Sequence, residues 1–432
     1  MIPSSVSPFP LRLGRALSLF VLIIYAVVFP ACKKNSDPAG VWRGLIKNSS
    51  GEEVAFTLEV KREGDKIVGS LVNGDDRTVS TGGSFEGHTI NLRYDFYDAT
   101  LNATVDGNEL RGTFTRQWQK QLLERKLMAK RENVSLAASD SSNSSNSLGE
   151  ISGEWVMRAG EEPKVSYWRA AFKQQGSRVR GTIIPLSGDW GEMTGSFENN
   201  QLTLNRFDGI NCRVFKAALT PKGALEGFVD FGLFKDPKRK IVAERLTAEN
   251  KSSVANLPDP NNYTRMSNSA ELFRFSFPDP DGKTISSTDE RFKNKVMVVT
   301  ITGSWCPNCY DEAPVLQEFY ARYRERGLEV VALAFEYTGD ASRDTRQVGI
   351  FAKRLGVTYP MLYAGGIEDA EKKLSQLVNF GAYPTTIYIG RDGLVKHIHA
   401  GFEGKATGDR FTRLKDEMRA LIEELLEPQE MR

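Results

Sequence analysis

Two cysteines three residues apart, in the segment WCPNC at 305–309, stand where a buried strand is expected to meet a helix. The β-branched and apolar run at 296–302 is typical of a strand buried on both faces. After the cysteines, apolar residues recur at intervals of three or four until Gly327, which predicts an amphipathic helix that begins at the motif. Redox chemistry commonly places two thiols at such a junction.

Cys306 is expected near the N-terminus of this helix, where unpaired N–H groups and the helix dipole favour an anion. In Cys-X-X-Cys settings the first thiol typically titrates at roughly 3.5–7.5 instead of near 8.5, so Cys306 is the predicted nucleophile. Cys309 should be more buried and should attack only after a substrate is captured. Glu312 follows Cys309 by three residues, so its carboxylate can take the proton of Cys309 during resolution.

A Cys-X-X-Cys pair can also supply half of a zinc site or form a purely structural disulfide. The remaining cysteines, Cys32 and Cys212, are far apart in the sequence, and the His-X-His pair at 397–399 is the sole histidine cluster. We therefore favour thiol-disulfide exchange. The prediction includes no metal and no cofactor beyond a redox-active disulfide between Cys306 and Cys309.

The pattern after the motif continues to alternate between strands and helices. Apolar residues at 328–335 predict the next buried strand, and the periodicity predicts helices at 344–355 and 368–378. At Tyr383–Pro384 a proline enters a predicted central strand, where proline is poorly tolerated without a special role. We therefore predict a cis peptide at this bond, facing the dithiol.

The last part of the chain has the pattern of a hairpin and a helix. The turn sequence GRDG at 390–393 links predicted strands at 387–389 and 394–399. Apolar residues between 411 and 425 then fall on one face of a final helix. Together these elements predict an α/β sandwich.

The order of these features resembles the thioredoxin fold, and specifically the TlpA-like thiol-disulfide oxidoreductases of the bacterial envelope. The resemblance covers roughly residues 257–427 and depends on WCPNC, on EAP at 312–314, on YPT at 383–385 and on the hairpin and helix that follow. Since the same fold also hosts peroxiredoxins, the fold alone does not decide the chemistry. The Pro-X-X-X-Thr-X-X-Cys element of peroxiredoxins is missing here, which makes a thiol peroxidase the less favoured reading.

The resemblance implies a catalytic role for three residues. Cys306 would be the attacking thiol, Cys309 the resolving thiol and Glu312 the acidic residue of a CxxCxxE pattern. Thr300 stands where cytoplasmic thioredoxins keep a buried aspartate, six residues before the first cysteine. The proton relay through that aspartate is therefore absent, which leaves Glu312 as the better candidate.

The resemblance also implies a substrate-binding face. Pro384 would be the cis-proline of this face, with Tyr383 and Trp305 beside it. Trp305 would shield the dithiol, although a core aromatic residue at this position is an alternative.

The resemblance favours reduction of protein disulfides, with electrons supplied by a membrane thiol transporter. The physiological direction is open from the sequence, because known Cys-X-X-Cys proteins have potentials between about −270 and −120 mV. An alternative from another class is a ligand-binding or scaffolding envelope lipoprotein that acts through its N-terminal region.

The N-terminus has the features of a secretory signal. Arg12 and Arg15 precede an apolar run at 16–31, which falls short of the roughly 20 residues needed to span a bilayer. Cys32 follows a small residue and resembles a lipoprotein cleavage point, so we predict lipid attachment there; ordinary cleavage and an uncleaved anchor remain alternatives. Lys33 after this cysteine favours the outer membrane. The protein is thus predicted to be lipid-anchored in the bacterial envelope and to face the periplasm.

Between this segment and the dithiol domain lie two copies of one pattern. The matching segments are offset by 112 or 113 residues: 40–42 and 153–155, 64–69 and 176–181, 83–86 and 195–198. Each copy has short alternating runs separated by Gly, Asn and Asp turns, which predicts an antiparallel meander that is closed or nearly closed. The aromatic residues at 168, 190, 207 and 215 are predicted to be core, and Cys212 is predicted to be a free buried thiol on a strand.

The predicted fold is therefore multidomain, with two antiparallel barrel-like β modules followed by an α/β thioredoxin-like domain. Its predicted segments are a signal segment at 1–32, module 1 at 38–132, a Ser/Asn-rich linker at 133–149, module 2 at 150–248, a second linker at 249–262 and the thioredoxin-like domain at 263–432. The net charge of +2 gives no reason to expect nucleic acid as a partner.

Overall fold

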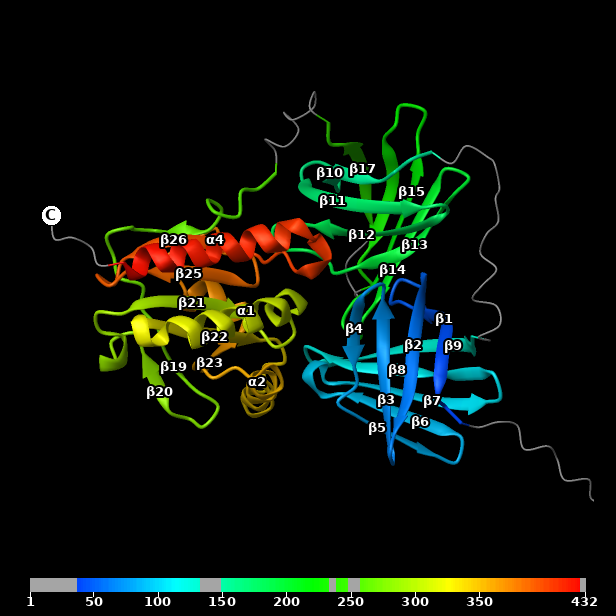
Figure 1. The fold of residues 1–432 in the computed structure, drawn as a ribbon, viewed down its shortest axis with the longest axis horizontal. Coiled ribbons are helices and arrows are strands. Elements are labelled where there is room, and N and C mark those ends of the chain that lie inside the picture. The colour runs from blue at the N-terminus through cyan, green and yellow to red at the C-terminus, as the bar shows by residue number, and fades with distance from the viewer. Residues whose placement is uncertain (1–36, 133–148, 233–237, 248–256, 428–432) are drawn as a thin grey trace, which may run out of the picture. The chain divides into compact units, whose positions relative to one another are not determined.

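The computed structural model describes residues 37–132, 149–232, 238–247 and 257–427. Cys32 and the rest of the predicted signal segment lie outside the described residues, as do residues 133–148 of the first linker. The described chain contains two antiparallel β modules and an α/β domain, which confirms the predicted fold class (Figure 1).

Module 1 is one antiparallel sheet with the strand order β4-β3-β2-β1-β9-β8-β7-β6-β5. Its strands are β1 (Gly40–Lys47), β2 (Glu53–Glu63), β3 (Lys66–Asn73), β4 (Asp76–Val79), β5 (Gly82–Glu86), β6 (Thr89–Tyr94), β7 (Ala99–Asp106), β8 (Glu109–Trp118) and β9 (Gln121–Arg131). In β2, β3 and β7 alternate residues face the core: in β2, Val54, Phe56 and Leu58 are buried, whereas the residues between them are exposed or half-buried.

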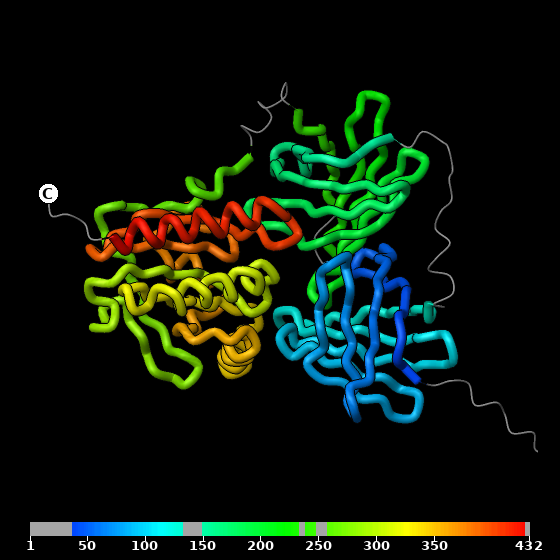
Figure 2. Tube along the Cα trace, in the orientation of Figure 1, coloured from blue at the N-terminus to red at the C-terminus, as the bar shows by residue number. Residues whose placement is uncertain are grey.

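Module 2 is a closed barrel in which the last strand pairs with the first (Figure 2). Its strands are β10 (Gly153–Ala159), β11 (Ser166–Gln175), β12 (Arg178–Ile184), β13 (Met193–Glu198), β14 (Gln201–Phe207), β15 (Cys212–Leu219), β16 (Leu225–Asp230) and β17 (Arg239–Arg245). Closure leaves no sheet edge unpaired. The aromatic residues predicted to be core are buried, and Cys212 is a free, fully buried thiol at the start of β15, as predicted.

The duplication extends to individual side-chain contacts. In both copies the opening tryptophan, Trp42 or Trp155, donates its indole N–H to the carbonyl four residues earlier, at 2.9 and 3.0 Å. A guanidinium from the last strand covers each indole ring, with Arg131 4.3 Å from the ring centre of Trp42 and Arg245 4.8 Å from that of Trp155. Each arginine also donates to two carbonyls of the segment that precedes its tryptophan.

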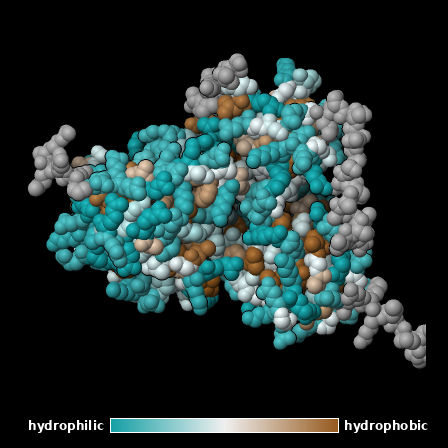
Figure 3. All heavy atoms as spheres, in the orientation of Figure 1, coloured by the Kyte–Doolittle hydropathy of each residue, from teal (hydrophilic) through white to brown (hydrophobic). Residues whose placement is uncertain are grey.

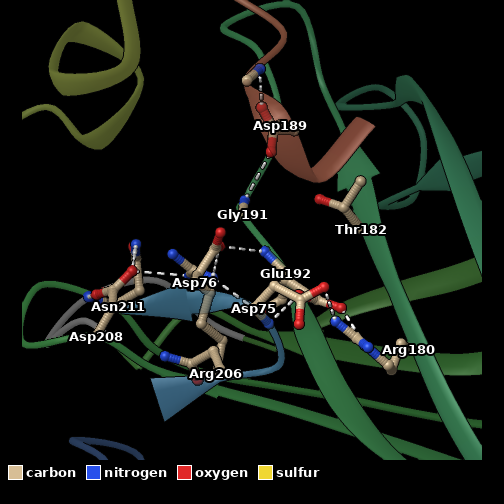
Figure 4. Close-up of polar contacts among 12 residues, drawn as sticks. Asp75, Asp76, Arg180, Thr182, Asp189, Gly191, Glu192, Arg206, Asp208 and Asn211 are labelled. Carbon is tan, nitrogen blue, oxygen red and sulfur yellow. Dashed lines mark hydrogen bonds and ion pairs between the residues drawn. The ribbon is translucent and has the colours of Figure 1, made fainter. Parts of the chain in front are cut away.

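Each module has a hydrophobic core of its own, and Phe207 of module 2 packs among the buried residues of the module 1 core. The side-chain amide of Asn73 exchanges two hydrogen bonds with the backbone of Phe207, at 3.0 and 3.1 Å. Arg206 of β14 is buried and forms ion pairs of 2.8 Å with Asp76 of module 1 and with Asp208 of module 2 (Figure 4). The contact between the modules is therefore apolar in part and ionic in part.

The C-terminal domain has a five-stranded sheet of order β23-β22-β21-β25-β26. The strands of this sheet are β21 (Val296–Thr302), β22 (Leu328–Glu336), β23 (Met361–Gly366), β25 (Thr385–Ile389) and β26 (Val395–Ala400). The domain also has two two-stranded sheets, one of β18 (Arg265–Met266) with β24 (Leu377–Val378) and one of β19 (Ser276–Pro278) with β20 (Thr284–Ser286). Its helices are α1 (Pro307–Tyr323), α2 (Ala341–Leu355), α3 (Ala370–Lys373) and α4 (Asp409–Leu426). All seven residues of the central strand β21 are buried, as predicted.

The two faces of β21 pack against different elements. Val298 faces the cluster that contains Leu316 of α1 and Met418 of α4. Val299 faces the opposite cluster, with Phe273 and Leu374. Covering β21 on both sides fixes its C-terminal end, which leads directly into the dithiol motif.

The face of the molecule drawn in Figure 3 is mostly hydrophilic, with smaller apolar areas.

One predicted helix is wrong in its second half. The helix expected at 368–378 continues only to Lys373, and Leu377–Val378 forms strand β24, which pairs with β18. Leu374 and Leu377 are buried as a helix would bury them, so their spacing alone did not distinguish the two structures. Pairing with a segment more than a hundred residues earlier overrides the local pattern.

Within the described residues, no helix has both the length and the apolarity to cross a membrane.

Candidate active site

Cys306 is the N-cap of α1, and Pro307 occupies the first helical position. The Sγ of Cys306 accepts a hydrogen bond from the N–H of Cys309 at 3.3 Å and lies 3.4 Å from the carbonyl oxygen of Tyr383, to which it donates. The sulfur thus lies between the positive end of a helix and the loop that carries Pro384. A thiolate at this position would keep the donor from the helix.

Cys309 is the more enclosed thiol of the pair, with 1% of its surface exposed against 4% for Cys306. Both are free thiols in the structure. Burial raises the pKa of Cys309 well above its ordinary value, and the neighbouring Cys306 and Glu312 add to this effect. Cys309 therefore holds its proton until something removes it.

Glu312 lies on the buried face of α1, one turn after Cys309, and is 1% exposed. Thr300 of β21 donates its hydroxyl to Oε2 at 2.7 Å, and Thr386 of β25 donates to Oε1. Burial raises the pKa of Glu312 to about 7, although the two hydroxyl groups act in the opposite direction. A carboxyl group with this pKa can both accept and release a proton near neutral pH.

The peptide bond between Tyr383 and Pro384 is cis, as predicted. Trp305 is half-buried; its indole N–H donates to the carbonyl of Phe335 at 2.8 Å, and its ring centre lies 5.1 Å from that of Tyr383. Tyr383 therefore contacts the Cys306 sulfur through its carbonyl and contacts Trp305 through its ring.

Residues 267–412 match the Redoxin family model. Thiol-disulfide oxidoreductase ResA of Oceanobacillus iheyensis is 27% identical over 159 residues, which are 36% of this chain and 74% of that protein. ResA of Bacillus thuringiensis is 30% identical over 125 residues, which are 29% of this chain and 65% of that protein. A solved thiol:disulfide interchange protein of the thioredoxin family from Chlorobium tepidum shares 20% identity, covering 38% of this chain and 100% of that one with a TM-score of 0.30.

The C-terminal domain is a thiol-disulfide oxidoreductase of thioredoxin-like fold. The matched region contains the dithiol, Glu312 and Pro384, whereas both β modules lie outside it. Among the described residues, no group of three or more His, Cys, Asp or Glu side chains is placed to hold a metal ion. Cys32, the predicted lipid attachment site, lies outside the described residues.

The oxidoreductase domain has a second buried carboxyl group that the sequence analysis missed. Glu336, the last residue of β22, accepts hydrogen bonds from the N–H and the hydroxyl of Ser304, both at 2.7 Å. Burial raises the pKa of Glu336 to about 7. A charged residue directly after the apolar run at 328–335 was the only signal in the sequence. Through its two hydrogen bonds to Ser304, Glu336 fixes the loop between β21 and α1.

Asn308, inside the motif, was also missed. Its side-chain amide donates to the carbonyl of Phe402 in the oxidoreductase domain and to that of Asp189 in module 2, at 2.9 Å in both cases. Module 1 approaches from another side, where the ring of Trp118 lies 4.9 Å from that of Tyr337 and 6.5 Å from that of Trp305. Both β modules therefore contact the immediate surroundings of the dithiol.

Proposed function

We propose that the protein is a TlpA-like thiol-disulfide oxidoreductase of the bacterial envelope that reduces protein disulfides through Cys306 and Cys309. The observation that carries this proposal is the position of the Cys306 sulfur, between the N-terminus of α1 and the carbonyl that precedes cis-Pro384. An anion on this sulfur is stabilised by the helix end, and a substrate sulfur can approach it from the side of the proline loop.

In the proposed reaction, the Cys306 thiolate attacks one sulfur of a substrate disulfide. The substrate S–S bond breaks, an S–S bond forms between Cys306 and the substrate, and the other substrate sulfur leaves as a thiolate that takes up a proton. Cys309 then loses its proton and attacks Cys306, which releases the second substrate thiol and leaves a Cys306–Cys309 disulfide. Two electrons pass to the substrate in each cycle, and a thiol donor must return them.

Glu312 is the proposed acceptor of the Cys309 proton. It lies one turn after Cys309 on the buried face of α1, and its charge contributes to the raised pKa of Cys309. A carboxyl pKa of about 7 makes the ionised form available at neutral pH, and transfer of the Cys309 proton to it generates the resolving thiolate.

We further propose that Trp305, Tyr383 and Pro384 form the face that receives protein substrates. Trp305 and Tyr383 are half-buried and Pro384 is buried, so the two aromatic residues supply the accessible part of this face. Large rings with limited flexibility are well suited to a docking face.

For the location, we propose a lipid anchor at Cys32 on the periplasmic side of the envelope, with the outer membrane favoured by Lys33. A membrane thiol transporter is the proposed source of electrons. The support for this is the sequence of the N-terminal segment and the resemblance to TlpA-like proteins.

The two alternative functions have less support. The interior of module 2 is filled by large side chains such as Trp155, Phe172 and Phe197, which leaves little room for a ligand inside the barrel. A peroxidase would use the same nucleophile, Cys306, and would consume hydrogen peroxide.

The proposed function is tested by following the reduction of insulin disulfides with dithiothreitol as electron donor. The wild type is expected to accelerate the reaction, and Cys306→Ser is expected to be inactive. Equal activity of the two proteins would refute the proposal, as would peroxide consumption by the wild type without any insulin reduction.

A further inference from the structure

The loop that joins β12 to β13 in module 2, at 185–192, differs from its counterpart in module 1. Applying the repeat offset of 112 residues, β4 at 76–79 of module 1 corresponds to 188–191 of module 2. In module 1 this segment pairs with β3 as a strand of the sheet. In module 2 it leaves the barrel and contacts the oxidoreductase domain instead.

The contact between this loop and the oxidoreductase domain is made by backbone at close range. Gly188 forms a parallel β-bridge with Phe402, the residue that follows β26 and Gly401. A Cβ on Gly188 would lie 1.9 Å from the carbonyl oxygen of Phe402, and one on Gly401 would lie 2.0 Å from that of Leu186. Both glycines have a positive φ, of 109° and 84°. Only residues without a side chain allow the two segments to approach this closely.

The loop is also tied to the dithiol motif itself. The amide of Asn308, which lies between the two cysteines, donates to the carbonyls of Asp189 and Phe402. Asn308 is in the first turn of α1, so Asp189 lies at the N-terminus of this helix. At the same helix end, the N–H of Cys309 donates to the sulfur of Cys306.

The carboxylate of Asp189 is held on both sides by backbone N–H groups (Figure 4). Oδ1 accepts from Gly404 of the oxidoreductase domain at 2.5 Å, and Oδ2 accepts from Gly191 at 3.0 Å. The side chain is 4% exposed. Burial raises the pKa of Asp189 to about 6, so the carboxylate is mainly ionised at neutral pH. The charged groups that act on it or line the adjoining cavity are Arg206, Asp76, Asp311, Lys405, Arg77 and Arg354.

We propose that Asp189 of module 2 is a positioning residue of the redox centre: its backbone carbonyl, bonded by Asn308, holds it at the first turn of α1, and the charge of its carboxylate makes the Cys306–Cys309 couple more reducing. This inference depends on the proposed function, because it requires that the couple exists. In the couple, the Cys306–Cys309 disulfide takes up two electrons and two protons to give two thiols. A negative charge beside the helix end opposes an anion on the Cys306 sulfur and so favours the disulfide.

The test is a measurement of the reduction potential of the full-length protein by equilibration with glutathione buffers at pH 7.5. For Asp189→Asn we expect the equilibrium constant to move three- to tenfold towards the reduced form, equivalent to a potential about 15–30 mV more positive. The shift should become smaller below pH 6, where the wild-type carboxyl group is itself protonated. A change in packing alone would not give this pH dependence.

The matched control is Asp230→Asn. Asp230 is another buried aspartate of module 2, but its carboxylate contacts Asn48, Ser50 and Gly232 of the two modules. We expect this variant to keep the wild-type potential. Gly188→Ala is a second variant that should displace the loop and move the potential in the same direction as Asp189→Asn. If Asp189→Asn does not fold, Gly188→Ala decides the matter in the same titration.

The inference is overturned if the folded Asp189 and Gly188 variants keep the wild-type potential, or if Asp230→Asn shifts it as much. A different result would remove the proposed function as well: a wild-type protein in which no Cys306–Cys309 disulfide forms in any glutathione buffer. The two failures are therefore distinguishable in one experiment.

Discussion

Glu312 combines full burial with a position beside Cys309, and this combination has a kinetic consequence. Because burial raises the pKa of Glu312 to about 7, the fraction of enzyme with an ionised carboxylate falls as the pH drops below 7. Only the ionised form can accept the Cys309 proton. The resolving step should therefore slow in acid while the first attack depends on Cys306 alone.

We predict that Glu312→Gln slows resolution of the mixed disulfide by about 100-fold at pH 7.5, the lower range for loss of a general base. Gln keeps the shape: its amide oxygen accepts from one of the two threonine hydroxyl groups, and its NH2 group can donate to the other once that hydroxyl rotates. Stopped-flow thiol exchange with a labelled peptide disulfide separates the two steps. A resolution rate in Glu312→Gln that equals the wild type would exclude Glu312 as the base.

The same carboxyl group should make stability depend on pH. Its pKa is about 7 in the folded protein against an ordinary value of 4.5, so between these values the folded state binds more protons than the unfolded state. Stability from this group is therefore lost as pH rises from 4.5 to 7, by about 3 kcal/mol in total. Glu312→Gln should lack this loss. Urea unfolding at pH 5 and pH 8 would contradict this if both proteins had the same pH dependence.

At the scale of single elements, the sequence predicts best where burial and periodicity agree. β21 and the start of α1 are such a case, because an apolar strand buried on both faces is followed at once by a helix with a clear apolar face. β24 is the opposite case. Its two residues take their conformation from Arg265 and Met266, and no local pattern carries that information.

The arginine that covers the opening tryptophan is a shared element of both β modules. Arg245 combines a cation–π contact with Trp155 and hydrogen bonds to two backbone carbonyls. We predict that Arg245→Ala destabilises the protein by about 2 kcal/mol and that Arg245→Lys recovers only part of this, because lysine lacks the planar fork. Glu244→Ala, at an exposed position of the same strand, is the control in guanidinium unfolding. An unchanged free energy of unfolding in Arg245→Ala would show that this arginine has no structural role.

At the scale of the whole molecule, the contacts among the three parts of the chain were beyond sequence analysis. Asn73 and Phe207 are 134 residues apart, and Asn308 and Asp189 are 119 apart. Each of these residues fits its own element without its distant partner, so local patterns gave no sign of the pairing. The two cysteines and the cis-proline could be predicted because short sequence motifs indicate them. The residues that bring the β modules to the dithiol could not.

The packing of module 2 residues into the core of module 1 predicts that the two β modules unfold together. Arg206 is buried between Asp76 and Asp208, so Arg206→Ala would leave a buried carboxylate without its partner. We predict a loss of about 3–5 kcal/mol and a separation of the single unfolding transition into two, whereas Lys173→Ala on the exposed surface should change stability by less than about 0.5 kcal/mol. Calorimetry of the full chain checks both. Two separate transitions in the wild type would contradict this coupling of the modules.

The measurement that most directly tests the central claim is the capture of a substrate on the first thiol. In Cys309→Ser the resolving step is blocked, so incubation with a disulfide-containing protein should accumulate a mixed disulfide, and mass spectrometry of its peptides should locate the bond at Cys306. If the captured protein is joined to another cysteine, or if Cys306→Ser captures as much as Cys309→Ser does, then Cys306 is not the nucleophile and the account is wrong.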